Sequence, residues 1–215
     1  MPDLEEILRS GFVEFKQFSA RLLDLDPDRS KALNANRPNF LISNRLGDYA
    51  ALSFSNTNQY RFEFQPEAVE DHLARSEEFG HYVSFAINPQ AKIDLFKSDV
   101  GSDNYIKLIY REEYIARLLA LMYLDSKGMQ LNRNQVWSRF EDKRVVLVTD
   151  RPKDVLSHYL GYTKAEADFK NLSPQQLKDK LRRIWYTNGL SEFNDLNRFD
   201  MPQILTPQQF YQLAA

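Results

Sequence analysis

The stretch that decides the fold reads YAALSFSNTNQYRFEFQ and covers residues 49–65. Its second half alternates aromatic with polar residues, which is typical of a strand with one buried side and one solvent-facing side. Asn56, Thr57 and Asn58 separate the two halves, and asparagine is a common turn residue. We therefore expect residues 49–55 and 59–65 to pair as an antiparallel β-hairpin.

Helices are predicted on both sides of this hairpin. Apolar residues recur every three or four positions over residues 3–24, which predicts an amphipathic helix capped by Asp3. Over residues 112–126 apolar side chains cover most of the helix circumference, so this helix should be buried on more than one side. Beyond residue 150 helix-start signals recur, such as Ser173 followed by proline and two glutamines.

Shorter patterns predict the remaining elements. They are, in chain order, a long loop with one short strand over 26–45, a helix over 67–79 that ends at Gly80, strands over 82–87, 105–110 and 144–149, a helix from 152 that ends at Gly161, and further helix starts at Thr163 and Thr206. Together they predict an α+β fold with a small mixed or antiparallel sheet, N-terminal and central helices, and a helical C-terminal extension.

Turn residues around 98–104 suggest a boundary. We expect an α+β part with the β-hairpin over 1–100 and a mostly helical part over 101–215, packed on the same body. Acidic residues outnumber basic ones in the first part, and the reverse holds in the second. This asymmetry is compatible with a basic interaction face on the C-terminal part, or simply with scattered solvated charge.

Composition excludes several classes of site. The chain has no cysteine, which rules out disulfides, zinc–thiolate sites, iron–sulfur clusters and cysteine nucleophiles. It has only 7 glycines and no glycine-rich phosphate loop, so the common nucleotide-cofactor enzymes are not expected. No charge-free apolar run approaches the ~18 residues of a membrane span. We therefore expect a cytoplasmic protein without a membrane partner.

One catalytic arrangement is suggested by the predicted hairpin. Asp48 and Glu63 should lie near its open end, with Gln65 on the same face as Glu63, and two carboxylates can bind Mg²⁺ and activate a water. The order of elements over residues 3–87 resembles the core of PD-(D/E)xK nucleases. The resemblance implies that Asp48 and Glu63 are catalytic and bind the metal, that Gln65 stands where that family usually has lysine, and that Glu14 supplies a helix carboxylate. The alternative is a hairpin with ordinary solvent-facing polar residues.

A partner-binding surface is predicted on the helix that begins at Ser173. Basic and aromatic side chains there suit phosphate contact and base stacking, or a protein partner. The residues concerned are Lys178, Lys180, Arg182, Arg183 and Trp185. The alternative is the ordinary polar face of a surface helix, with Trp185 in the core.

The three histidines do not have the spacing of a metal-binding pair. Arg151 and His158 have the spacing of the Arg-x₄₋₆-His motif of HEPN ribonucleases, but that family is all-helical and the strand signals argue against membership. Two hypotheses remain: a non-catalytic, macromolecule-binding regulator or mobile-element accessory factor, and, as the alternative, a Mg²⁺-dependent nuclease. We expect no cofactor unless the second holds. The ligand and the oligomeric state are left open.

Overall fold

The sheet at one side of the molecule contains three strands. The computed structural model describes residues 3–44, 49–54, 59–129, 147–148, 152–187, 189–194, 204–206 and 208. Strands β2 (Ala50–Phe54) and β3 (Tyr60–Phe64) pair antiparallel, which confirms the predicted hairpin. Strand β1 (Asn39–Ile42) runs parallel to β3 on its other side, so the order is β1-β3-β2 and the sheet is mixed.

Aromatic side chains join this sheet to the helices. On β3, Phe62 and its neighbours in the alternating pattern are buried. The ring of Phe62 lies 5.3 Å from Phe12 of α1 (Leu4–Leu23) and 5.2 Å from Phe79 of α4 (His72–Ile87). Phe12 also lies 4.9 Å from the ring of Tyr82. Edge-on aromatic contacts of this kind add to the stabilisation from burial, and they fix the sheet against α1 and α4.

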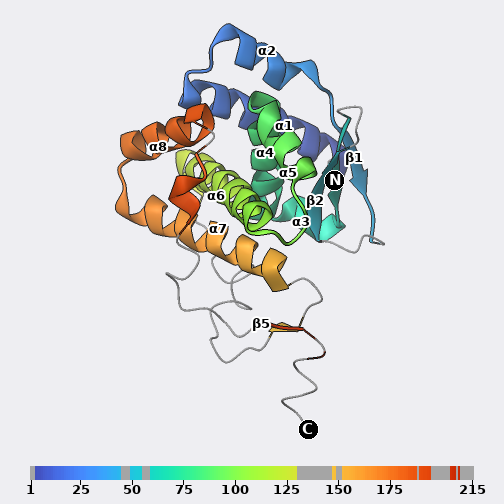
Figure 1. The fold of residues 1–215 in the computed structure, drawn as a ribbon. Helices are drawn as coiled ribbons and strands as arrows, with labels where there is room; N and C mark the ends of the chain where they lie inside the picture. Colours follow the sequence, from blue (N-terminus) through green and yellow to red (C-terminus); the bar gives the residue numbers. More distant parts are fainter. Residues whose placement is uncertain are drawn as a thin grey trace.

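Helix α6 (Asp103–Ser126) passes through the centre of the molecule, with α4 and α7 (Pro152–Asn171) packed against it (Figure 1). Its side chains are buried from Leu108 to Leu124 apart from Ile109, which confirms the predicted burial of 112–126 on several sides. The helix begins earlier than predicted, because Ser102 caps it by accepting a hydrogen bond from the Tyr105 amide. The strand predicted over 105–110 is therefore wrong.

Two glycines interpreted as helix stops lie inside helices. Gly80 is within α4 and Gly161 is within α7, and both helices continue past them. A β-carbon on Gly80 would lie 2.7 Å from the Ala116 carbonyl oxygen, and one on Gly161 would lie 2.4 Å from the Glu113 β-carbon. Both glycines are thus required where α4 and α7 touch the backbone of α6. The strand predicted over 82–87 is wrong as well, because α4 runs through it.

The remaining elements cover this core. Helix α2 occupies part of the segment predicted as a loop, because Asp26 caps it and proline stands at its first position. The helix start predicted at Thr163 is wrong, since Thr163 lies within α7. Thr206 is described, but most of the helix predicted to start there lies outside the described residues, as does most of the strand predicted over 144–149. The other bounds are α2 (Pro27–Ala35), α3 (Pro66–Glu70), α5 (Pro89–Lys97), β4 (Leu147–Val148), α8 (Pro174–Thr187), the short 3₁₀ helix η1 (Ser191–Phe193) and β5 (Ile204–Leu205), which pairs parallel with β4.

Taken together, these elements make an α+β fold: a helix-rich body with a small mixed sheet, as predicted. The α6 helix of the predicted second part packs on α4 of the predicted first part. Within the described ranges, no helix combines the length and the apolar character needed to cross a bilayer.

Candidate functional site

Two histidines from different helices face one buried carboxylate. Glu113 of α6 has a side chain only 8% exposed. Its Oε1 lies 3.1 Å from Nε2 of His158 on α7, and its Oε2 lies 3.5 Å from Nε2 of His81 on α4. The first distance is that of a hydrogen bond, while the second is that of an ion pair. Glu113 therefore orients both imidazoles at the place where the glycines bring the three helices together.

The same arrangement is repeated one turn along α6. Arg117 is fully buried, and its guanidinium lies 3.1 Å from Glu77 of α4 and 2.9 Å from Glu166 of α7. The ring of Tyr162 lies 4.8 Å below it, and the Tyr162 hydroxyl bonds to Glu77. Charged side chains are almost never fully buried unless they are paired. The ion pairs of Arg117 therefore join α4 and α7 to α6 one turn from Glu113 and the two histidines.

A third polar group adjoins Glu113. The carboxylate of Glu112 accepts a hydrogen bond of 2.6 Å from the Ser84 hydroxyl and one of 3.0 Å from Nε of Arg111. The indole N–H of Trp185 donates to Ser84 at 3.4 Å. Glu112 is thus held in place by α4, α6 and α8 together.

Glu112, Glu113 and the two histidines line a cleft of about 440 Å³ between β2 and helices α4, α6 and α7. Strand β2 forms one wall, and the Leu52 backbone amide donates a hydrogen bond to Glu78 of α4. Of the two histidines that line this cleft, His158 has 43% of its side chain exposed and His81 has 14%. The polar residues on the cleft wall are Tyr49, Glu78, His81, Glu112, Glu113, His158 and Tyr162.

The charges in the cleft shift one another's pKa values. Burial opposes the charged form of His81, but the carboxylates of Glu113, Glu78 and Glu77 outweigh it and raise the His81 pKa to about 10. Burial raises the pKa of Glu78 to about 7, against the opposing effect of His81. Burial would also raise the Glu113 pKa, but His158 and His81 hold it well below its usual range. At neutral pH Glu113 is therefore a carboxylate, His81 is an imidazolium, and Glu78 is close to its pKa and can exchange a proton.

Such groups can transfer protons and stabilise negative charge. Glu78 can accept or donate a proton near pH 7, and the imidazolium of His81 can stabilise charge that develops on a substrate oxygen. As for metals, the part of the chain that the structure describes contains no cluster of three or more histidine or carboxylate side chains able to hold an ion.

The hairpin residues predicted as a nuclease site are only partly described. Asp48 lies outside the described residues, so its distance from Glu63 is not defined. On β3, Glu63 accepts hydrogen bonds of 2.9 Å from the Ser53 hydroxyl and 2.8 Å from Nε of Arg61. Gln65 is the N-cap residue of α3, and its backbone amide donates to the Tyr49 carbonyl. The nuclease hypothesis, with its Mg²⁺ ion, stays a prediction.

The cations predicted as a binding surface on α8 are close to carboxylates. Lys178 and Arg182 lie 2.6 and 3.5 Å from Asp24, and Lys180 lies 2.6 Å from Asp168. Arg183 lies 2.7 Å from Glu192 but keeps 61% of its side chain exposed. Trp185 is partly buried against the core. The surface is therefore largely neutralised within the chain, with Arg183 as its most exposed cation.

The cleft was not predicted from the sequence. A search for histidines four residues apart on one helix cannot find His81 and His158, which come from two helices. The usable signal was the pair Glu112 and Glu113 inside an apolar helix, because carboxylates at buried positions need partners.

Two of the strands that argued against the HEPN family, those predicted over 82–87 and 105–110, are helical in the structure, whereas the hairpin strands are present. Arg151, the other residue of that motif, lies outside the described residues. No family model, curated protein or solved structure matches the chain. The functional assignment therefore rests on the geometry of the cleft.

Proposed function

We propose that the chain is an enzyme that performs general acid–base chemistry in the cleft between β2 and helices α4, α6 and α7. The observation that carries this proposal is the position of Glu113 between His81 and His158, at the wall of an open cleft. A network that served only to join helices would not need to open onto a cleft of this size. Perturbed titratable groups in a cleft are typical of catalytic sites.

Each group has a role that follows from its surroundings. Glu78, with its pKa of about 7, takes the proton from the attacking water or hydroxyl. His81 carries positive charge up to about pH 10 and stabilises negative charge on the substrate. His158 is the more exposed imidazole, and its bond to Glu113 orients it toward the substrate. Glu78 returns the proton that it took from the nucleophile to the leaving group.

The charge of the cleft indicates the kind of substrate. Three carboxylates, Glu78, Glu112 and Glu113, line the same space as the two histidines. This balance does not favour a polyanion such as a nucleic acid, whose binding depends on an excess of positive charge. An uncharged polar substrate with an ester or amide group fits better, and its hydrolysis requires the proton transfers described above.

A hydrolysis assay with p-nitrophenyl esters and anilides over pH 5–10 tests the proposal. We expect a bell-shaped profile that rises near pH 7, as Glu78 ionises, and falls near pH 10, as His81 loses its proton. Glu78→Gln should reduce the rate at least ~100-fold, whereas Glu70→Gln, an exposed residue on α3, should leave it unchanged. Activity should persist in EDTA, because every catalytic role in this proposal belongs to a side chain.

Two results would contradict this proposal. The first is turnover that is unchanged in both Glu78→Gln and His158→Ala, which would place the reaction elsewhere. The second is the absence of turnover on every substrate across the whole pH range. Cleavage of labelled DNA or RNA that requires Mg²⁺ and is lost in Asp48→Ala and Glu63→Ala would support the nuclease hypothesis instead.

Macromolecule binding through α8 is a second proposal, favoured by one specific observation. Tyr186 at the end of α8 is 50% exposed, and the guanidinium of Arg29 lies 4.4 Å from its ring centre. Tyr186 thus presents an aromatic ring beside two cations, Arg29 and the exposed Arg183. Fluorescence anisotropy with labelled RNA and DNA tests it. We expect Arg183→Glu to weaken binding about tenfold at low salt, while Lys97→Glu on α5 does not. Equal affinities would remove this surface from consideration.

A further inference from the structure

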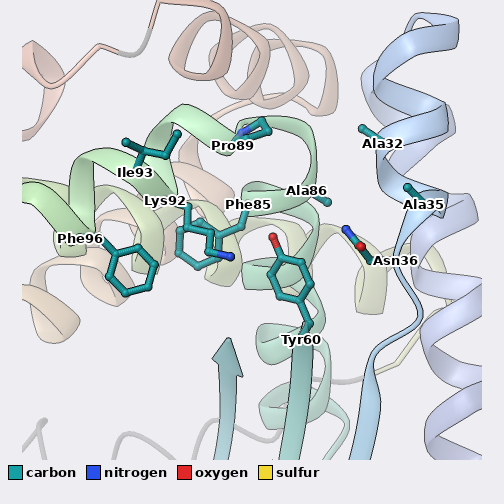
Figure 2. A pocket seen from close by; sticks show the side chains of 10 residues that line it. All are labelled: Ala32, Ala35, Asn36, Tyr60, Phe85, Ala86, Pro89, Lys92, Ile93 and Phe96. Atoms are coloured by element: carbon teal, nitrogen blue, oxygen red, sulfur yellow. The ribbon is translucent and has the colours of Figure 1, made fainter. Parts of the chain in front are cut away.

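A second cavity of about 330 Å³ lies between α5, the end of α4 and the C-terminal end of α2 (Figure 2). Its walls are mostly apolar. Phe85 lines both this cavity and the acid–base cleft, so the two spaces are neighbours with a shared wall. The volume is at the lower end of the range found for small-molecule sites, about 300–1,000 Å³.

Lys92 of α5 supplies positive charge inside this apolar cavity. The residue is only 6% exposed. Its ammonium nitrogen lies 4.6 Å from the ring centre of Phe54 and 4.8 Å from that of Tyr60, which are cation–π distances. Burial lowers the Lys92 pKa. The lysine is therefore kept inside by two aromatic faces rather than extended into solvent.

Other polar groups lie beside this ammonium. Figure 2 shows the Lys92 nitrogen and the Tyr60 hydroxyl turned into the same space, with the Asn36 side chain on the opposite wall. Tyr60 is itself buried, and burial raises its pKa, so its hydroxyl stays a hydrogen-bond donor at neutral pH. Two hydrogen-bond donors, the charged ammonium of Lys92 and the neutral hydroxyl of Tyr60, thus lie at one end of the cavity.

The other end of the cavity is apolar and open to solvent. Phe96 is 56% exposed and Ile93 is 41% exposed, although both are large hydrophobic residues on the cavity wall. A ligand placed against them would remove this apolar surface from water, which favours binding. The cavity therefore has a polar end and an apolar end.

We propose that this cavity binds a small carboxylate with an apolar body. The ammonium of Lys92 pairs with the carboxylate, the Tyr60 hydroxyl donates a hydrogen bond to it, and the apolar body lies between Phe85, Ile93 and Phe96. Charge-assisted hydrogen bonds to a carboxylate are among the stronger contacts that a small site can make. This site is separate from the proposed catalytic groups, so its test does not depend on turnover.

Calorimetric titration with 3-phenylpropionate tests the proposal, and 3-phenylpropanol, which has the same skeleton without the charge, serves as the matched probe. We expect the acid to bind the wild-type protein at least about tenfold more tightly than the alcohol, as the loss of one charged hydrogen bond implies. Lys92→Met keeps the apolar stem and should remove this preference. Lys97→Met, an exposed lysine on the same helix, should keep it.

A second variant tests the cavity itself. Ala35 lines the opening and is exposed, so Ala35→Phe fills the space without loading the core, and it should weaken binding of the acid about tenfold or more. If Lys92→Met fails to fold, the wild-type comparison and Ala35→Phe decide the matter. Equal affinity for acid and alcohol, no binding of either up to about 10 mM, or full binding by Ala35→Phe would each overturn the proposal.

Discussion

Substitution of Gly161 by alanine is expected to destabilise the protein strongly. The added β-carbon would lie 2.4 Å from the Glu113 β-carbon and 2.9 Å from the Tyr114 amide nitrogen, against at least 3.4 Å for ordinary contacts. Helices α6 and α7 would have to separate by about 1 Å, and overpacking of this kind costs about 1–3 kcal/mol. The contacts include backbone, which cannot rotate away, so the upper part of this range applies. Alanine's better helix propensity returns about 1 kcal/mol.

We therefore expect a net loss of about 2 kcal/mol, which lowers the urea midpoint by about 1 M for an m-value of about 2 kcal/mol/M. Gly11→Ala in α1 is the matched control. Its β-carbon would meet its nearest neighbour, Arg75, at 3.6 Å, which is an ordinary contact. The control should therefore gain up to about 1 kcal/mol from helix propensity alone.

Urea unfolding followed by circular dichroism measures both changes. The two substitutions are chemically identical and both lie within helices, so only the distance to the neighbouring element distinguishes them. A Gly161→Ala protein at least as stable as the wild type would refute the close approach of α6 and α7. So would a Gly11→Ala protein that loses as much stability as Gly161→Ala.

Three further predictions concern stability. Glu113→Gln leaves two histidines without their shared carboxylate and should cost about 3–5 kcal/mol by urea unfolding, whereas Glu14→Gln, which breaks the exposed pair with Lys127, should cost less than about 1 kcal/mol; similar losses would contradict the buried network. The raised pKa of His81 means that its stabilising charge is fully present below about pH 6.5 and is lost as pH rises toward 10, so the stability difference between wild type and His81→Gln should shrink over that interval, and a constant difference would argue against it. Ser173→Ala removes the cap that accepts from Gln176 and should lower the free energy of unfolding by about 1 kcal/mol, with Ser191→Ala as a control without a side-chain cap role.

The parts of the fold that could be predicted are those where local chemistry agrees with tertiary packing. The alternation of Tyr60, Phe62 and Phe64 matches a strand with one buried face, and β3 has that face. At Ser173 the sequence pattern of a capping box is met in full, since the Ser173 hydroxyl accepts from the Gln176 amide and the Gln176 side chain accepts from the Ser173 amide.

The errors come from elements that are buried all round. Residues 82–87 contain tyrosine, valine, phenylalanine and isoleucine, which favour strands, but packing of α4 against α6 and the sheet outweighs that preference. Gly80 and Gly161 act as contact points between helices, a role that depends on a partner far along the chain. The start of α2 carries a helix-start signal like that at Ser173, a capping residue, Asp26, followed by proline. The segment was nevertheless predicted as a loop because its composition is polar.

The site was harder to predict because its members come from three helices. His81, Glu113 and His158 are separated by more than thirty residues at each step, and nothing in the local pattern of any one of them indicates the others. The hairpin acids Asp48 and Glu63, by contrast, could be paired from the sequence because a single predicted turn lies between them. The packing of α4 and α7 against α6 brings these charges together.

The shared carboxylate and the shared guanidinium on α6 have a consequence for how this protein can change over time. A substitution at Glu113 alters a contact with α4 and one with α7 at once, and the same holds for Arg117. A replacement of Glu113 or Arg117 therefore affects the partner residues on α4 and on α7 together. In homologues that lack one of these two groups, we expect coordinated replacements at three positions, one on each helix, rather than at two.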